Sequence, residues 1–143
     1  MLGFLDLSAA FDCVDHALLF NLLQQGFGID GTALRWLTSF LSDRTQVIAY
    51  NGCTSAIIQL KYGVPQGSVL GPLLHLLYTA ELFDIIHKCG LAAHCYADDT
   101  QVYLSSSVPD VPAAVENFQV CVEKIEEWLR ASRLKMNSEK THR

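Results

Sequence analysis

The sequence predicts an α+β fold in which helices pack on one face of a small sheet. Hydrophobic residues make up 50% of the 143-residue chain, which suits one buried core and therefore one domain. Short apolar runs typical of strands alternate with longer segments whose apolar residues recur at helical spacing. Neither a repeat nor a low-complexity tract interrupts this alternation. One sheet covered by helices is the architecture that such an order of elements favours.

In the first half of the chain, a strand and two helices are expected before a β-hairpin. Their ranges are 2–7 for the strand, 12–25 and 32–41 for the helices, and 45–50 and 56–62 for the hairpin strands. The first strand is an apolar run that starts almost at residue 1, so we expect a sheet edge to be missing upstream. Gly26 and Gly28 supply the stop of the first helix. Asn51-Gly52 predicts the hairpin turn, with residues 53–55 lengthening its loop.

In the second half, a long helix precedes a tight pair of strands and a second amphipathic helix. The ranges are 72–88 for the helix, 91–96 and 100–104 for the strands, 115–129 for the last helix, and 135–137 for the start of a further strand. Pro72 suits the first turn of its helix, and Gly90 marks the stop. Residues 97–99 form the bend between the two strands. Residues 105–112 are polar and form a linker.

The overall charge offers no general surface for nucleic acid. The net charge is -5 and only 17% of residues are charged, whereas a free-standing nucleic-acid binder usually carries a basic face. This balance argues against autonomous function of these residues on a nucleic acid.

Several features bear on compartment. The first residues lack a basic leader and reach Asp6 early, so we expect an intracellular protein, nuclear or cytoplasmic, and not a secreted one. The uncharged stretch 62–80 is interrupted by glycine and proline, which predicts a loop and a buried helix, with no contact to a membrane.

The five cysteines include no CxxC pair, which favours a reducing compartment. A cluster of His87, Cys89, His94 and Cys95 could bind zinc, but its spacing matches no zinc finger.

Three acids stand where strands end. Asp6 closes the first apolar run, and Asp98 and Asp99 occupy the bend after another strand. Carboxylates crowded together repel one another and lose solvation, so a hard cation such as Mg²⁺ usually accompanies them. Two such ions can activate a 3′-hydroxyl and stabilise a leaving pyrophosphate. Each acid alone could equally be an ordinary turn residue, so the prediction depends on the combination.

Four segments in order resemble the motifs of reverse transcriptases of the non-LTR retrotransposon (LINE) type. LDLSAAFDCVDH (5–16) is similar to motif A, GVPQGSVLGPLL (63–74) to motif B, YADD (96–99) to motif C and LRASRLKMNSEKT (129–141) to motif D. SFLSDRTQ (39–46) is also similar to the LINE-type group. The resemblance covers nearly the whole chain and implies a reverse-transcriptase palm-like sheet, incomplete at both ends, over residues 1–143.

The resemblance implies a chemistry for four residues. Asp6, Asp98 and Asp99 become the ligands of two Mg²⁺ ions, with Asp6 and Asp98 touching both. Lys140 falls where motif D carries a lysine thought to donate a proton to pyrophosphate. An ordinary exposed lysine near a chain end, without a catalytic role, is an equally good interpretation of Lys140.

The resemblance also implies three substrate-binding residues. Phe11 falls where a ring packs under the incoming sugar and excludes a 2′-hydroxyl, which selects deoxynucleotides. Without motif A around it, Phe11 would be a core aromatic at a helix start. Gln66 and Gly67 fall beside the nascent base pair and the template, although a glycine-rich connector would look the same by composition.

The chain departs from the family pattern in two respects, and two functions stay open. The fingers segment before motif A and the thumb after motif D are not among these residues, and His75 stands where the family more often has an aromatic or apolar residue. One function is RNA-directed DNA polymerisation from deoxynucleoside triphosphates on an RNA or DNA template-primer. The alternative is a catalytically inactive retrotransposon remnant, a passive fold or binding module, and we expect the isolated fragment to be inactive.

Overall fold

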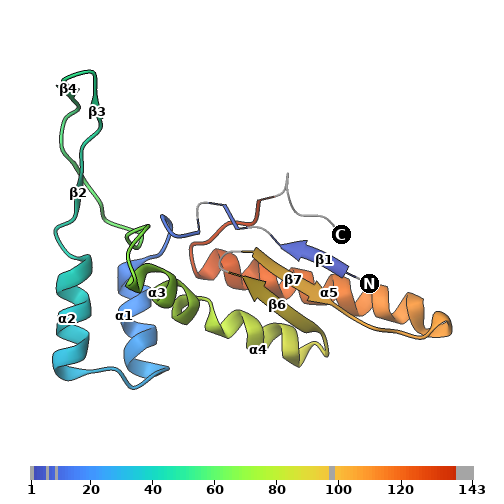
Figure 1. Ribbon diagram of the computed structural model, residues 1–143. Helices are drawn as coiled ribbons and strands as arrows, with labels where there is room; N and C mark the ends of the chain where they lie inside the picture. The colour runs from blue at the N-terminus through green and yellow to red at the C-terminus, as the bar shows by residue number, and fades with distance from the viewer. Residues whose placement is uncertain (1, 6, 9, 97–98, 138–143) are drawn as a thin grey trace.

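A three-stranded antiparallel sheet, a set of helices and a projecting hairpin make up the computed structural model (Figure 1). The structure describes residues 2–5, 7–8, 10–96 and 99–137. Helices lie against the sheet, while one pair of helices and the hairpin extend to one side of it. The mixed architecture confirms the α+β prediction.

The sheet runs in the order β1-β7-β6. Its strands are β1 (Leu2–Leu5), β6 (Ala92–Tyr96) and β7 (Asp99–Tyr103). In the central strand β7, Thr100 and Val102 are buried whereas Gln101 and Tyr103 are exposed. Because side chains alternate between the faces of a strand, one face of the sheet packs on the core and the other meets solvent.

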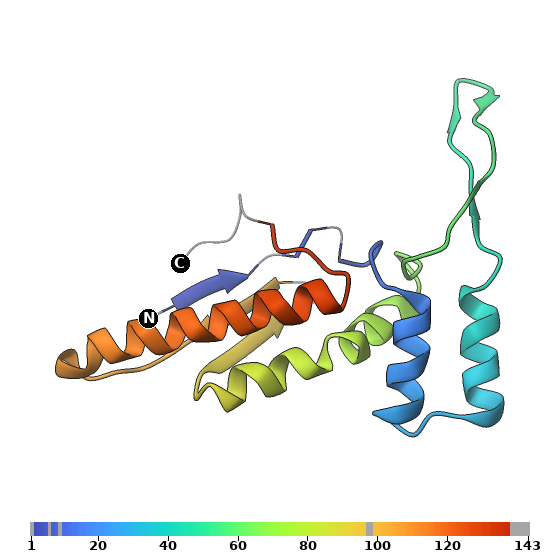
Figure 2. The same ribbon diagram turned by 180° about the vertical axis from the view of Figure 1, so that it is seen from behind.

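Helix α5 (Val111–Ala131) covers the packed face, and in Figure 2 it lies in front of the sheet. The short 3₁₀ helix η1 (Val108–Asp110) precedes it. The buried residues of α5 recur at helical spacing and are Phe118, Cys121, Val122, Ile125 and Leu129. Helix α4 (Ala80–Lys88) packs beside it against both α5 and β6. This pair of helices supplies much of the hydrophobic core.

The prediction of one helix over 72–88 is wrong, because α3 (Leu70–Tyr78) and α4 are separate helices that meet at Thr79. The amide and the hydroxyl of Thr79 both donate to the carbonyl of His75 at 3.0 Å. Hydroxyl back-bonding of this kind bends helices. Helix α3 also begins ahead of Pro72, because Ser68 Oγ accepts a hydrogen bond from the Gly71 amide at 2.9 Å.

The two helices of the first half, α1 (His16–Gln25) and α2 (Gly31–Leu41), pack against each other. Helix α1 starts later than the predicted residue 12, because Asp15 is its N-cap. The Asp15 carboxylate accepts the Leu18 amide at 3.0 Å. Residues 10–14 are therefore free to pair with another segment of backbone.

The hairpin projects away from the body and contains β2 (Thr45–Gln46), β3 (Ala49–Tyr50), β4 (Cys53–Thr54) and β5 (Ile58–Gln59). Asn51 and Gly52 have φ of 49° and 79°, which a type I′ turn requires. The predicted loop extension at 53–55 is wrong, because Cys53 pairs with Tyr50 and Thr54 with Ala49. The extra residue lies instead between the two strand pairs, where the register shifts as in a β-bulge.

No helix in the described part of the chain is both long enough and apolar enough to cross a membrane.

Candidate active site

Two segments far apart in the sequence, residues 11–15 and 62–64, lie side by side. The Val64 amide donates to the carbonyl of Phe11 at 2.8 Å, and the Gly63 amide donates to the carbonyl of Val14 at 2.8 Å. An antiparallel bridge joins Asp15 and Tyr62 just beyond. Backbone hydrogen bonds therefore hold the motif A segment against the start of the motif B segment.

Glycine is required where these segments meet. Gly63 has φ of 85°, and a Cβ there would lie 3.0 Å from the Asp12 Cα. Its carbonyl accepts a hydrogen bond from Arg44 Nη1 at 2.8 Å, and His16 Nε2 lies 2.8 Å from the same oxygen. A larger residue would push the two segments apart and break these contacts.

The three predicted substrate-binding residues lie together. Phe11, Gln66 and Gly67 line a pocket of about 340 Å³ with Pro72. Gly67 has φ of 77°, and nothing lies within 4 Å of the position of a Cβ, so its conformation favours glycine while the pocket stays open on that side. Gln66 Nε2 donates to Asp12 Oδ1 at 3.3 Å, which restrains the orientation of its amide.

Phe11 serves the core and the pocket at once. Its ring stacks on His75, with centroids 4.7 Å apart and planes inclined by 26°. His75 belongs to α3 and is 1% exposed, so the predicted burial of this position is confirmed. Phe11 itself is half-buried, packed against core residues on one side and open to the pocket on the other.

Of the predicted metal ligands, Asp99 lies within the described residues. It is exposed, begins β7 and pairs with Tyr96 across the bend. Asp6, Asp98 and the predicted proton donor Lys140 lie outside the described residues. Among the residues that the structure does describe, no group of three His, Cys, Asp or Glu side chains could hold a metal ion, and this includes the cysteine and histidine residues at 87–95.

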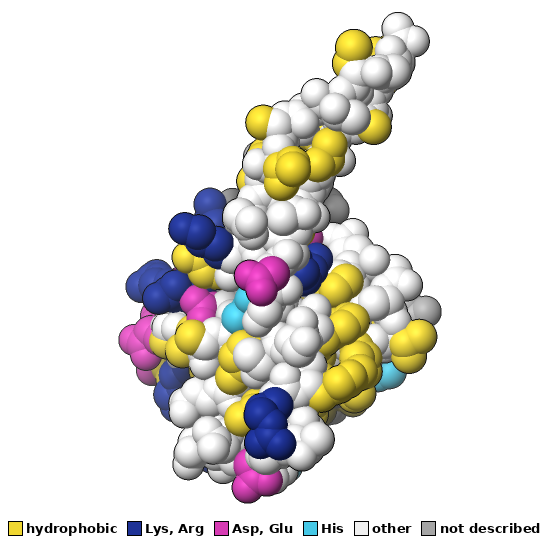
Figure 3. Space-filling view, turned by 90° about the vertical axis from the view of Figure 1, so that its left-hand side faces the viewer, with side chains coloured by type: hydrophobic (Ala, Val, Ile, Leu, Met, Phe, Trp, Pro, Cys, Tyr) yellow, Lys and Arg dark blue, Asp and Glu magenta, His cyan; other side chains and the backbone are white. Residues whose placement is uncertain are grey.

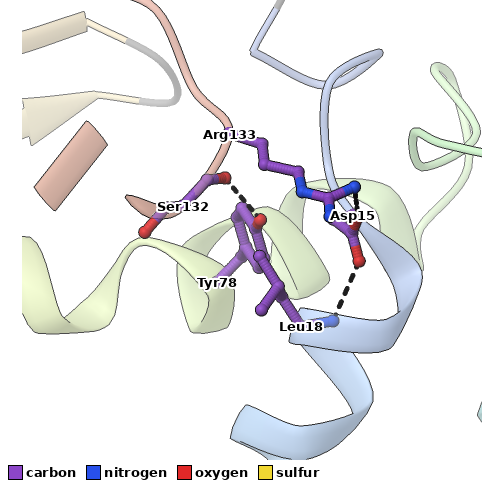
Figure 4. Close-up of polar contacts among 5 residues, drawn as sticks. All are labelled: Asp15, Leu18, Tyr78, Ser132 and Arg133. Atoms are coloured by element: carbon purple, nitrogen blue, oxygen red, sulfur yellow. Dashed lines mark hydrogen bonds and ion pairs between the residues drawn. The ribbon is translucent and has the colours of Figure 1, made fainter. Parts of the chain in front are cut away.

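An ion pair that the sequence did not predict links motif A to motif D. Arg133 Nη1 lies 2.7 Å from Asp15 Oδ2, while the other Asp15 oxygen caps α1 (Figure 4). Beside it the Tyr78 hydroxyl donates to the Ser132 carbonyl at 2.6 Å. Burial is the main cause that raises the pKa of Tyr78 above its usual 10.0. No local pattern marks Arg133, whose φ of 56° turns the chain back after α5.

In place of the strand predicted to begin at 135–137, the described residues form an isolated β-bridge. Met136 makes an antiparallel bridge with Leu7, and the Ser8 amide donates to the Lys135 carbonyl at 2.8 Å. The segment after α5 is thus fixed to the segment after β1.

The fold and the ordered motifs together define a domain of the nucleic-acid polymerase class. The chain belongs to the reverse transcriptase (RNA-dependent DNA polymerase) family, whose family model matches residues 1–143.

Curated relatives agree with this assignment. The RNA-directed DNA polymerase from mobile element jockey of Drosophila melanogaster is 30% identical over 96% of this chain, which covers 15% of that protein. The probable RNA-directed DNA polymerase from transposon X-element of the same species is 33% identical over 97% of this chain, again covering 15%. The chain therefore spans a small part of these relatives. The predicted resemblance to polymerases of mobile elements is confirmed.

A solved structure supports the fold alone. Apo telomerase from Candida tropicalis, truncated from its C-terminal domain, matches with a TM-score of 0.71 and 16% sequence identity. The match covers 99% of this chain and 30% of the telomerase chain.

Proposed function

We propose that these residues form the catalytic palm of an RNA-directed DNA polymerase, which adds deoxynucleotides to a primer 3′-hydroxyl. The observation that carries the proposal is the pocket lined by Phe11, Gln66 and Gly67, beside the backbone contacts of motifs A and B. A pocket of this kind brings an aromatic face, an amide and an open backbone to one place. Polymerases of this family act on a template-primer and nucleotide substrates.

Each pocket residue then has a role in nucleotide binding. The Phe11 ring packs under the sugar and leaves no room for a 2′-hydroxyl. Gln66 donates from its amide, and Gly67 lets the nascent base pair approach the backbone. Outside the described residues, Lys140 would donate a proton to the leaving pyrophosphate.

Enzymes of this family use divalent metal ions, and Asp6, Asp98 and Asp99 would hold two Mg²⁺ ions here. The strand register supports this assignment, since Leu5 pairs with Thr100 and Tyr96 pairs with Asp99. The described neighbours of all three acids therefore lie at one end of the sheet. The exposed Asp99 carboxylate offers the hard oxygen ligand that Mg²⁺ prefers. Bound there, the two ions would activate the 3′-hydroxyl and stabilise the leaving group.

A titration with Mn²⁺, a paramagnetic substitute for Mg²⁺, tests the metal site in the purified chain. We expect the NMR signals of the Leu5, Asp99 and Thr100 amides to broaden first, and Asp98→Asn to weaken this effect strongly. Asp84→Asn, which removes an exposed carboxylate on α4, is the matched control and should change nothing. Broadening spread over all exposed acids, and insensitive to Asp98→Asn, would show that the proposed site is absent.

A further inference from the structure

The buried histidine of α3 supports one of the residues that line the pocket. His75 is 1% exposed and does not line the pocket, and its ring stacks on that of Phe11, which does. Phe11 lines the pocket together with Gln66, Gly67 and Pro72. The position of the Phe11 ring in the pocket therefore depends on the His75 ring that it stacks against.

His75 is itself held firmly. Its carbonyl accepts two hydrogen bonds from Thr79 at 3.0 Å, at the junction of α3 and α4. At the other end of α3, a Cβ on Gly71 would lie 2.5 Å from the Pro65 carbonyl oxygen, so the helix sits tightly on the loop that bears Gln66 and Gly67. The pocket wall and the ring beneath Phe11 thus belong to one closely packed segment, with little freedom for His75 to shift.

We propose that His75 is a positioning residue for sugar selection, which holds the Phe11 ring at the height that excludes a 2′-hydroxyl. The proposal rests on the proposed function, in which Phe11 packs under the sugar. A flat ring stacked at 4.7 Å leaves Phe11 one favoured position, whereas an aliphatic side chain would let it tilt or sink. Steric exclusion depends on shifts smaller than an atom, since van der Waals contact is lost or becomes a clash within about 1 Å.

Nucleotide binding to the purified chain tests this inference. The Gly67 amide is followed by NMR during titrations with dGTP and with GTP in the presence of Mg²⁺. Since a pocket rejects an added hydroxyl only modestly, we expect a preference for dGTP of about tenfold. In His75→Leu the preference for dGTP over GTP should fall about threefold or more, because Phe11 loses the planar ring on which it stacks. His75→Phe supplies a planar ring again and should restore the preference. His75→Leu keeps a bulky apolar side chain at the buried position, so that the fold survives the substitution.

Two further variants separate this inference from the proposed function. In a Phe11→Ala background, His75→Leu should have no effect on the preference, because His75 acts through the Phe11 ring. Leu76→Ala on the same helix, at a side chain 45% exposed, is the matched control and should leave the preference unchanged.

The outcomes that overturn the inference are distinct. If Phe11→Ala abolishes the preference while His75→Leu leaves it intact, His75 has no positioning role and the proposed function stands. An effect of His75→Leu that persists without Phe11 would also overturn it. If Phe11→Ala changes nothing, or neither nucleotide perturbs Gly67, the proposed role of Phe11 fails and the inference fails with it.

Discussion

At the scale of single residues, Asp15 joins the start of α1 to the segment after α5 through one carboxylate. It caps α1 by accepting the Leu18 amide and pairs with Arg133 after α5, and it is 5% exposed. We expect Asp15→Ala to lower the free energy of unfolding by about 1–2 kcal/mol, mostly through loss of the cap. The ion pair adds less, because the Arg133 side chain is 62% exposed and its charge stays solvated. Urea denaturation of the two proteins measures the difference.

A matched aspartate provides the control. Asp30 occupies the N-cap position of α2 but makes no side-chain hydrogen bond there. Asp30→Ala should therefore cost much less than Asp15→Ala. Equal losses in the two variants would mean that the Asp15 cap and ion pair contribute nothing beyond helix-start preference.

Some contacts between single residues could be predicted from the sequence, and others could not. The proximity of Phe11, Gln66 and Gly67 follows from the family motifs, and the structure brings these residues to one pocket. The pairing of Asp15 with Arg133 could not be predicted, because it depends on the left-handed turn that reverses the chain after α5. Such a turn in a non-glycine residue has no reliable local signal.

At the scale of elements, the hairpin should contribute little to stability. Every residue of its four strands is exposed, so folding gains little apolar burial from it. We expect replacement of residues 47–57 by Asn-Gly to change the free energy of unfolding by less than about 0.5 kcal/mol, as for other surface changes. Thermal unfolding followed by circular dichroism measures this.

The same deletion should reduce self-association. The hairpin carries exposed apolar side chains, including Ile48, Tyr50 and Ile57 at 62%, 81% and 70% exposure. Figure 3 shows hydrophobic side chains in yellow along the projection. Apolar side chains and open strand edges favour association between molecules. Sedimentation velocity should show less oligomer in the deletion variant. A matched Gly52→Ala variant strains the turn but keeps the apolar side chains, so it should still associate.

The boundaries of the helices and strands follow only in part from the spacing of hydrophobic residues. Asn51-Gly52 identified the turn correctly, because few residue pairs accept two positive φ angles. The bulge and the break at Thr79 were missed, since hydrophobic spacing runs through both without interruption. Each depends on a short-range hydrogen bond of a hydroxyl residue: the Ile48 amide donates to the Ser55 hydroxyl in one case, and the Thr79 hydroxyl donates to the His75 carbonyl in the other. Serine and threonine also occur where they make no such bond, so the residue type alone does not reveal these features.

At the scale of the whole molecule, the sheet presents one open face. Exposed Gln101 and Tyr103 line β7 on that side, at the strand that begins with Asp99. With a net charge of -5, the chain supplies no general attraction for a phosphate backbone, so its own grip on a duplex should be weak.

We therefore expect the 143 residues, purified alone, to show little or no primer extension with Mg²⁺, deoxynucleotides and a primed RNA template. Polymerisation needs the nucleotide and the primer terminus in near-attack geometry, which can account for about 7 kcal/mol or more of the barrier. The matched relatives are far longer, and this chain covers 15% of the jockey polymerase. Residues outside the matched segment would share in that positioning. Gel analysis of a labelled primer gives the readout.

Two outcomes decide what the expected lack of activity means. If the purified chain does extend the primer, and Asp98→Asn abolishes extension while the circular dichroism spectrum is unchanged, then these residues suffice and the expectation is wrong. If the chain is inactive, the next experiment is a chimera in which this chain replaces the matching segment of the jockey polymerase. Extension by this chimera, abolished again by Asp98→Asn, would show a sound catalytic centre and place the defect in substrate grip. An inactive chimera that still folds and binds template-primer would place the defect in the centre itself and support the inactive remnant.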